Sequence, residues 1–496
     1  MRGNGRIPPK LRGTPGAMTP PPPGWCARLS ADHPALARVF RAFGGTGPSA
    51  CSADALASWS SRAKAGLAHR VVAVLSDEVD TDQAAMFARR LSAVGQLSTR
   101  IGQPALRLAL MARATELLEA KGPRALRIRA LADFYYSQAA RLHHQAHTPA
   151  RPLAEVVAAA AWTPVGTGLD WTQLTGPGPA GPLHINVLRG HHPTVRCVHL
   201  PGGHPSLPDV VREHGAAAGV SGGFFLYSEP DIPAPLARRD PVGLLLTDGQ
   251  VVAGPWFRRA TLVVKGDGQV VDRVGPVGFT VSAGGHTVRI EACNDPAATG
   301  PTLFNRAFGT RAPRTGLRIR GSQARGHGDD IDLLGGVVTG LPDVRGPVTW
   351  RAPAGWRQAM AGGPMLLGDG PTLDLVHEDF AEDAPPITFS RDETYDENLL
   401  PRMAAGLDAD GRLVFAAIDG RNFDRAPGFT LRMTADLMRA LGCVRAMNLD
   451  GGSSKRMAVG GRCVDLASTE VVSTGSGPAP VRKVVTAILV GEGQSV

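Results

Sequence analysis

Residues 446–457 read Ala-Met-Asn-Leu-Asp-Gly-Gly-Ser-Ser-Lys-Arg-Met, and the rest of the predicted fold is arranged around them. The preceding run, Phe429 to Gly442, has apolar residues at helical spacing and a glycine where a helix would end. Residues 444–449 then form a short apolar segment that is typical of a buried strand. Asp450 follows this strand directly, and the glycines after it allow the backbone to approach a ligand closely. The pattern predicts a site-forming turn; the alternative is an ordinary tight turn followed by solvated basic residues.

Length and composition limit the possible functions. A chain of 496 residues exceeds what one ordinary core supports, so we expect two domains. The formal net charge of +9 comes mainly from scattered arginines without a long basic block or interleaved aromatic residues, which favours an anionic substrate over nucleic acid. The six cysteines are widely spaced and include no C-x-x-C pair, so neither a metal cluster nor a disulfide framework is indicated.

Targeting signals are not evident in the sequence. No stretch approaches the length of uninterrupted apolar residues that spans a membrane. The first 23 residues are basic and rich in proline and glycine, and they lack the apolar region of a signal peptide. The sequence as written therefore predicts a soluble, cytoplasmic protein, and export would require a different start.

Composition divides the chain into four predicted parts. Residues 1–30 are a Pro/Gly-rich tail predicted to be disordered, and residues 31–164 have the periodicity of an α-helical domain of unknown role. Residues 165–181 are rich in Gly, Pro and Thr and predict a linker, and residues 182–496 have the short alternating runs of strands. Within that last part the Arg- and Gly-rich residues 302–330 predict a loop.

Other stretches combine glycine pairs or charged residues with a strand end, as the 446–457 stretch does. In chain order they are Ser221-Gly222-Gly223-Phe224-Phe225, Gly362-Gly363 before Pro-Met-Leu-Leu, Arg402-x-Ala-x-Gly, and Asp419-Gly420-Arg421. Glycines at a strand end indicate close approach of another backbone or a ligand. For the first stretch, a glycine bulge with both phenylalanines in the core is the alternative.

Taken in order, these five motifs resemble the phosphodiester glycosidase family, which includes the enzyme that removes N-acetylglucosamine from a phosphodiester on mannose and bacterial exopolysaccharide-related proteins. The resemblance covers about residues 180–491 and includes the final predicted strand near residues 481–487. It implies an α+β fold, in which a C-terminal mixed-sheet catalytic domain with flanking helices follows the α-helical N-terminal domain.

The chain departs from the family pattern at two places. Ser221 stands where the family usually has Asn, and Ser453, Lys455 and Arg456 stand where the family usually has Gly, Ser and Thr. Because these changes add bulk and positive charge beside Asp450, they predict an altered shape and charge of the pocket.

The resemblance and the chemistry of sugar–phosphate cleavage together predict the roles of individual residues. Positive charge develops on the anomeric carbon and negative charge on the departing phosphate, so a carboxylate should face the first and cationic donors the second. We expect Asp450 to act as base or nucleophile and Asp419 as second carboxylate, with Glu229 as a weaker competitor. Arg402 is expected to hold the phosphate together with the backbone N–H groups of Gly222, Gly223, Gly451 and Gly452. The alternative for each aspartate is a structural turn residue. The predicted substrate-binding residues are Ser221, Gly222, Gly223, Phe224, Phe225, Gly362, Gly363, Arg421, Asn448, Gly451, Gly452, Ser453 and Ser454.

These observations predict a hydrolase that cleaves glycosyl-1-phosphodiesters, with the N-acetylglucosamine type as the candidate sugar and exopolysaccharide or cell-envelope glycan metabolism as the candidate role. The competing predictions are a catalytically silent sugar-phosphate-binding module and a phosphodiesterase acting on non-sugar diesters. The last is disfavoured because the sequence has no H-x-H or H-D metal motif. No cofactor and no metal ligand set is predicted, although a divalent cation held by Asp and Asn would leave no distinctive spacing.

Overall fold

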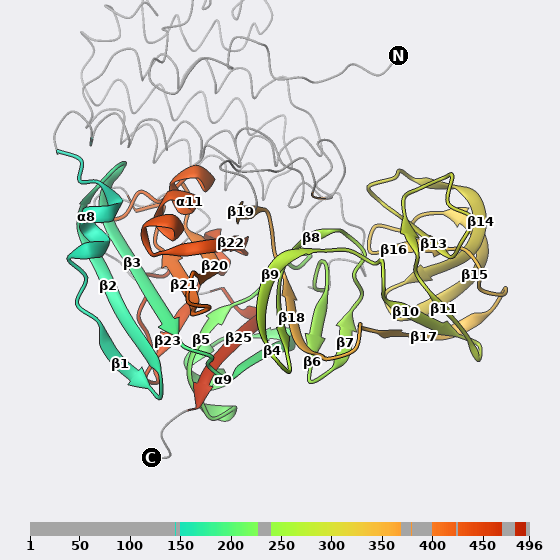
Figure 1. Ribbon diagram of the computed structural model, residues 1–496, viewed down its shortest axis with the longest axis horizontal. Helices are drawn as coiled ribbons and strands as arrows, with labels where there is room; N and C mark the ends of the chain where they lie inside the picture. The colour runs from blue at the N-terminus through green and yellow to red at the C-terminus, as the bar shows by residue number, and fades with distance from the viewer. Residues whose placement is uncertain are drawn as a thin grey trace, which may run out of the picture. The chain divides into compact units, whose positions relative to one another are not determined.

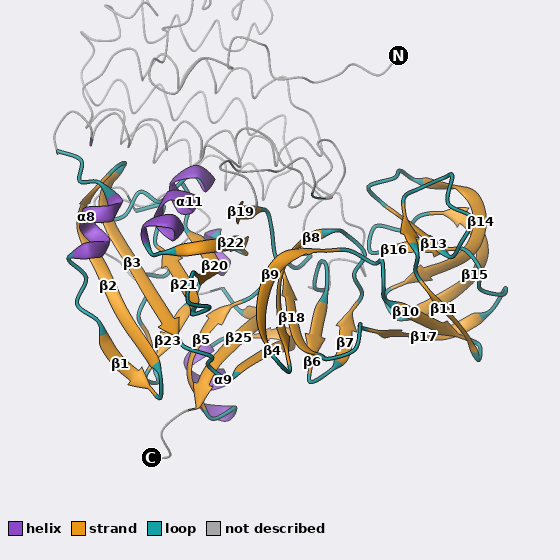
Figure 2. Ribbon diagram, in the orientation of Figure 1, coloured by secondary structure: helices purple, strands orange, loops and turns teal. Residues whose placement is uncertain are grey.

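The computed structural model describes His144, residues 149–226, 240–368, Glu378, 399–422, 425–468 and 482–492. Antiparallel strands make up most of this part of the chain (Figures 1 and 2). All of these residues belong to one compact unit, Ala140–Val496; a second unit, Met1–Ala139, contains none of them. The predicted tail and nearly all of the predicted helical domain lie outside the described residues. No described helix has the length and hydropathy of a membrane-spanning segment.

The strands form four sheets, named here I to IV. Sheet I has the order β1-β2-β3-β21-β20-β22-β19, with bounds Thr163–Gly166, Leu169–Gly178, Gly181–Gly190, Leu413–Ile418, Arg402–Asp408, Cys443–Leu449 and Met365–Leu367. Sheet IV has the order β24-β23-β5-β25-β4, with bounds Arg462–Cys463, Met457–Val459, Ala216–Ser221, Val484–Glu492 and Val195–His204.

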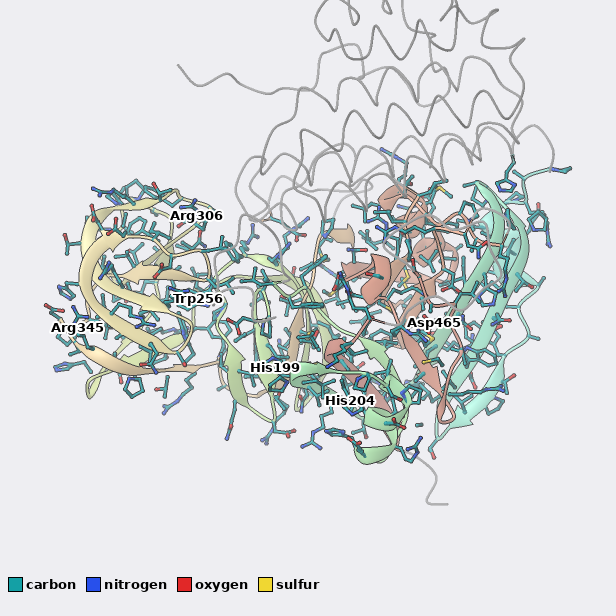
Figure 3. All side chains as sticks on the ribbon, turned by 180° about the vertical axis from the view of Figure 1, so that it is seen from behind. His199, His204, Trp256, Arg306, Arg345 and Asp465 are labelled. Carbon is teal, nitrogen blue, oxygen red and sulfur yellow. The ribbon has the colours of Figure 1, made fainter. Side chains whose placement is uncertain are left out.

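Sheets II and III are built from the middle of the chain. Sheet III has the order β7-β6-β18-β8-β9, with bounds Gln250–Ala253, Leu245–Thr247, Trp356–Ala361, Arg259–Lys265 and Gly268–Val274. Sheet II has the order β11-β10-β17-β15-β14-β16-β13-β12, with bounds His286–Arg289, Thr280–Ala283, Arg345–Arg351, Gln323–Asp330, Arg311–Arg320, Gly335–Val338, Thr302–Asn305 and Ala292–Cys293. Figure 3 shows Arg306 and Arg345 on sheet II, whereas Asp465 lies among the strands of sheets I and IV.

The largest cluster of buried apolar side chains joins three sheets. It combines Phe415 of sheet I, Leu262 of sheet III, and Val220 and Ile488 of sheet IV with their neighbours. A second cluster lies on the other face of sheet I, where α8 (Leu153–Ala158) and α11 (Leu431–Ala440) cover the strands. Helix α9 (Leu207–Glu213) covers sheet IV. One face of sheet I is thus packed against other sheets and the opposite face against helices.

Helix α11 forms where the sequence predicted a helix. Thr430 caps it, since its side chain accepts a hydrogen bond from Met433 N at 3.1 Å, and its apolar side buries Leu431, Ala435 and Leu437. The chain then passes through Gly442, with φ of +86°, directly into β22. Helix α11, the turn at Gly442 and strand β22 together place Asp450 at the end of sheet I.

The predicted α+β class is wrong for the described residues, which contain three α-helices among many strands. Every strand pairing there is antiparallel except that of β12 with β13, so the predicted mixed sheet is also replaced by four largely antiparallel ones. The physical reason is the connections: turns such as Asp248-Gly249 and Asp267-Gly268 join consecutive strands as hairpins, which leaves no need for helical crossovers.

Two segments predicted as irregular are strands. Residues 165–181, predicted as a linker, contribute to β1, β2 and β3, and residues 302–330 contain β13, β14 and β15. In β14 the buried Leu317 and Ile319 alternate with arginines that reach outward, which is a two-residue strand period. The high content of glycine, proline and arginine obscured this period in the sequence.

Candidate functional site

The five motifs that the sequence analysis singled out meet at one end of sheet I. Strands β21 and β22 end there with Ile418 and Leu449, and β20 begins there with Arg402, because antiparallel neighbours run in opposite directions. The pairing of Arg402 with Ile418 and of Met403 with Leu449 places Asp419 and Asp450 on either side of the start of β20. The sheet thus brings together the three residues that the sequence predicted as catalytic.

The glycine pairs pack backbone against backbone at this end of the sheet. A Cβ atom on Gly223 would lie 2.1 Å from Ala361 O, one on Gly362 would lie 2.4 Å from Asn448 O, and one on Gly451 would lie 2.6 Å from Pro401 O. Asp450 N donates to Gly222 O at 3.1 Å, which ties the first motif to the last. Glycine is required at these positions because no side chain fits between the segments.

Two of the amides expected to hold phosphate are already engaged. Gly222 N donates to Thr486 O and Gly452 N donates to Pro401 O, each at 2.8 Å. A backbone N–H bound to a carbonyl inside the fold is not available to a substrate oxygen. The part of the prediction that these two groups cradle phosphate is therefore corrected.

Several other predicted substrate contacts also have internal partners. Asn448 is buried, and its Nδ2 donates to Gly363 O at 3.0 Å. Ser221 Oγ accepts from Arg456 N at 3.0 Å, and Ser454 Oγ accepts from Arg482 Nη1 at 3.3 Å. These side chains hold the segments of the site together.

The aromatic pair after Gly223 belongs to the interior. Phe224 and Phe225 are buried, and Phe224 packs with Leu226 and Val242. The guanidinium of Arg259 lies 5.2 Å from the centre of the Phe224 ring. The alternative interpretation of a glycine bulge with both phenylalanines in the core describes this stretch.

Two arginines lie beside the Asp450 turn. Arg402 is buried, and its Nε donates to Phe429 O at 3.0 Å. Arg421 has a left-handed backbone, with φ of +57°, and its Nη1 would lie 3.5 Å from a Cβ on Gly452. The guanidinium of the Asp419-Gly-Arg turn therefore lies next to Gly452 of the Asp450-Gly-Gly turn. Asp450 itself is half-buried, and Ser453 is buried in the short 3₁₀ helix η6 (Gly452–Ser454) that follows it.

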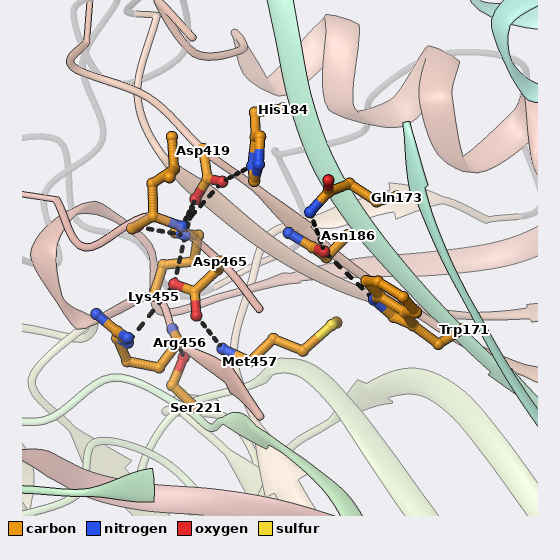
Figure 4. A network of polar contacts seen from close by, with 11 residues as sticks. Trp171, Gln173, His184, Asn186, Ser221, Asp419, Lys455, Arg456, Met457 and Asp465 are labelled. Carbon is orange, nitrogen blue, oxygen red and sulfur yellow. Dashed lines mark hydrogen bonds and ion pairs between the residues drawn. The ribbon is translucent and has the colours of Figure 1, made fainter. Parts of the chain in front are cut away.

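Asp419 differs from Asp450 because it lies inside a buried polar network (Figure 4). Its side chain is 1% exposed and contacts His184 Nδ1 at 2.5 Å, Leu466 N at 3.1 Å and Lys455 Nζ. Lys455 is completely buried, and its Nζ also donates to Asp465 Oδ2 at 2.7 Å and to Leu466 O at 3.2 Å. Asp465 Oδ1 in turn accepts from Met457 N at 2.9 Å.

The charges of this network balance within the fold. Burial alone would lower the pKa of Lys455, but the Asp419 and Asp465 carboxylates outweigh it and raise that pKa above its ordinary value. Burial would likewise lower the pKa of Arg456, and Asp465, whose Oδ2 lies 3.5 Å from Arg456 Nε, is the main cause that raises it instead. Two cations therefore neutralise two carboxylates away from water.

The sequence did not predict the parts that His184, Lys455 and Asp465 have in this network. Lys455 and Arg456 follow two serines, a pattern that is usual for solvated residues, and the two carboxylate partners of Lys455 lie 36 and 10 positions away. Nothing in the local pattern signals that burial. Glu229, the weaker competitor for the second carboxylate, lies outside the described residues.

Metal-binding and nucleophilic cysteine chemistry find no support in the described part of the chain. No group of three or more His, Cys, Asp or Glu side chains is placed there to hold a metal ion. Burial raises the pKa of the Cys443 thiol to about 12 and raises that of Cys197 as well, so neither is a thiolate at neutral pH.

Comparison with known proteins gives one family. Residues 258–491 match the model of the phosphodiester glycosidase family. The SPbeta prophage-derived uncharacterized protein YomE of Bacillus subtilis (strain 168) is 40% identical over 65 residues, which are 13% of this chain and only 10% of the length of that protein.

Two solved structures are similar at low identity. A hypothetical protein from Synechocystis has 18% identity and a TM-score of 0.43, covering 67% of this chain and 63% of that one. The catalytic domain of zebrafish N-acetylglucosamine-1-phosphodiester alpha-N-acetylglucosaminidase, auto-inhibited by its pro-peptide, has 15% identity and a TM-score of 0.38, covering 66% and 84%. The matched residues, 258–491, include Arg402, Asp419 and Asp450, and this match confirms the resemblance of that part of the chain to the phosphodiester glycosidase family.

Proposed function

We propose that this chain hydrolyses glycosyl-1-phosphodiesters, breaking the bond between the anomeric carbon of a sugar and the phosphate oxygen. The observation that carries the proposal is that Asp450 and Gly452, which has the Arg421 guanidinium next to it, lie in one turn at the sheet end where β20 begins with Arg402. N-acetylglucosamine-α-1-phosphodiesters are the first substrates to try. Exopolysaccharide or cell-envelope glycans are the proposed source of such bonds.

Asp450 is assigned to the sugar side of the reaction. Its half-buried carboxylate would stabilise the positive charge on the anomeric carbon, as base towards water or as nucleophile. Arg402 and Arg421 would bind the phosphate, because a guanidinium pairs with phosphate oxygens through two parallel hydrogen bonds. These cations would stabilise the charge that accumulates on the leaving group.

The leaving group makes a second acid less necessary than in ordinary glycosides. Cleavage releases a phosphate monoester, whose second pKa is about 6 and which therefore departs readily without a proton at neutral pH. Asp419 is engaged with His184, Lys455 and Leu466, which fits a carboxylate that organises the site more than one that donates a proton to substrate. In our proposal Asp419 acts on the substrate only through the groups it holds.

The test compares sugar release by the wild type with that by Asp450→Asn. We expect the wild type to release free sugar and Asp450→Asn to lose turnover while keeping the same unfolding transition, since the exchange preserves shape. Asp436→Asn, an exposed aspartate on α11, is the matched control and should keep full activity.

Two results would count against the proposal. A folded Asp450→Asn variant with normal turnover would remove Asp450 from the mechanism. A wild type that binds a panel of glycosyl phosphodiesters but turns none of them over would identify the chain as a sugar-phosphate-binding module.

A further inference from the structure

A lysine ammonium lies in the interior beside the proposed site. The Lys455 side chain has no exposed surface, and its Nζ contacts the carboxylates of Asp419 and Asp465 and the carbonyl of Leu466 (Figure 4). Among the described residues, two further charged or titratable groups lie against these carboxylates: His184 at Asp419 and Arg456 at Asp465. Removing an ammonium from water is costly unless partners of opposite charge surround it, and here two do.

The three partners of Lys455 lie on segments that carry or flank the site. Asp419 lies two residues before Arg421, whose guanidinium lies next to Gly452 of the Asp450-Gly-Gly turn. Lys455 itself ends η6, which begins two residues after Asp450. Asp465 and Leu466 follow β24, and Asp465 also accepts from Met457 N at the start of β23. The Lys455 ammonium therefore joins Asp419, at the end of β21 in sheet I, to Asp465 and Leu466, which follow β24 of sheet IV.

We propose that Lys455 is a positioning residue for the proposed reaction, holding the Asp419-Gly-Arg turn against the Asp450 turn so that Arg421 and Asp450 address the same substrate. The inference rests on the proposed function. It assigns Lys455 no contact with the substrate. Its role is to fix a distance. Because the Lys455 ammonium binds both segments, it holds Arg421, which binds the phosphate, at a constant spacing from Asp450, which faces the sugar.

A purely structural ion cluster would leave a different signature from a positioning residue. If Lys455 only neutralises buried charge, any variant that restores the charge balance restores everything. If it positions the two turns, charge balance restores stability while the rate of the chemical step stays low. Misplacement by about 1 Å at a reacting centre can lower a rate about 100-fold.

The experiment compares three variants on the same substrate. Lys455→Met removes the bridge and leaves two carboxylates with one cation, Arg456. Lys455→Met combined with Asp465→Asn removes the bridge and one negative charge, so the remaining charges balance. Asp465→Asn keeps the lysine and its contact with Asp419. Lys265→Met, at the far end of β8, is the control for the loss of a lysine elsewhere in the fold.

We expect the charge-balanced double variant to unfold close to wild type and yet to have a kcat lower by about 100-fold, with KM changed far less. Asp465→Asn should lower kcat by about tenfold, because one of the two anchors of the ammonium is lost. Lys265→Met should match the wild type in both constants.

The outcomes separate this inference from the proposed function. If the wild type and Lys265→Met release sugar and the double variant does so equally fast, the positioning role is overturned and the glycosidase stands. If Lys455→Met and the double variant do not fold, a kcat of Asp465→Asn equal to wild type overturns the role in the same way. If the wild type releases no sugar, the proposed function fails and the role of Lys455 fails with it.

Discussion

Asp419 and Asp450, each followed by glycine, lie at the same end of sheet I, but their surroundings differ in how far they let the carboxylate reach a substrate. Asp450 is half-buried in a turn whose Gly452 lies next to the Arg421 guanidinium, so its carboxylate is partly accessible to a substrate. Asp419 is inside, with an ammonium, an imidazole and a backbone amide as partners. The two side chains are chemically identical, so burial and hydrogen-bond partners decide which of the two carboxylates can react with a substrate.

At the residue scale, the sequence placed Asp450, Asp419 and Arg402 correctly at strand ends and gave Asp450 the first role, but it did not predict the burial of Asp419. That burial comes with His184 and Lys455, which contact Asp419, and with Asp465, which contacts Lys455. A lysine beside an arginine after two serines gives no local signal of burial. Contacts of that kind arise only from the tertiary fold.

The raised pKa of Lys455 predicts how stability depends on alkaline pH. The folded protein keeps this proton to a higher pH than the unfolded chain, so the stabilisation is complete below about 10.5 and is lost as pH rises from there through the folded-state pKa. We expect the difference in unfolding free energy between wild type and Lys455→Met to shrink over that range, measured by urea denaturation from about pH 9 to about pH 11.5. A difference that stays constant would contradict this prediction.

Arg421 offers a test of phosphate recognition. Arg421→Ala should lower kcat on a glycosyl phosphodiester by about 100-fold, since one donor to the developing charge is lost. The same variant should act nearly normally on an aryl glycoside with a neutral leaving group if the wild type accepts one. Arg425→Ala, an exposed arginine four residues on, is the control. Equal losses on both substrates would argue against a phosphate contact.

At the scale of elements, the site depends on how closely neighbouring segments approach. Gly222, Gly362 and Gly451 lie in three separate motifs, and each backbone there touches another. The sequence correctly indicated that these glycines mark close approach, but it could not tell a ligand from another strand as the approaching partner. Both leave the same pattern of paired glycines at a strand end.

Substitution of one such glycine should damage the fold and the site together. Gly362→Ala would bring a Cβ to 2.4 Å from Asn448 O, a backbone atom that cannot move aside alone. We expect a loss of about 1–3 kcal/mol in unfolding free energy together with reduced turnover. Gly266→Ala is the control, because a Cβ there meets nothing within 4 Å, and its effect should stay within about 0.5 kcal/mol. Equal stability of the two variants would refute the packing argument.

At the scale of the whole molecule, charge and topology are the features that extend beyond the site. The formal net charge of +9 attracts anions towards the surface. The fold class was the part of the prediction that failed, because resemblance and helical periodicity in residues 31–164 suggested α+β, whereas hairpin connections make the described residues mainly β. The final strand, β25, was predicted near its observed position, but its pairing partners were not. Local periodicity contains no information about partners that lie hundreds of residues away.

The overall charge predicts a salt effect on substrate capture. Raising NaCl from about 0.02 M to about 0.3 M shortens the screening length. We therefore expect KM for an anionic glycosyl phosphodiester to rise, by up to about tenfold, with kcat little changed. A neutral glycoside serves as the control and should show no such rise. A KM for the anionic substrate that is independent of salt would contradict the role of the net charge.

The place of β25 in sheet IV has a consequence for how the protein is made. This strand lies between β5 and β4 and pairs with both, although about 260 residues separate it from β5 in the sequence. A ribosome that adds 5–20 residues per second needs roughly 13–50 s to cover that interval. Throughout that time β4 and β5 have left the ribosome with open edges, which are prone to pair with other chains. Until β25 is made, these edges can therefore pair with other chains, and faster synthesis of the second half of the chain would shorten the exposure.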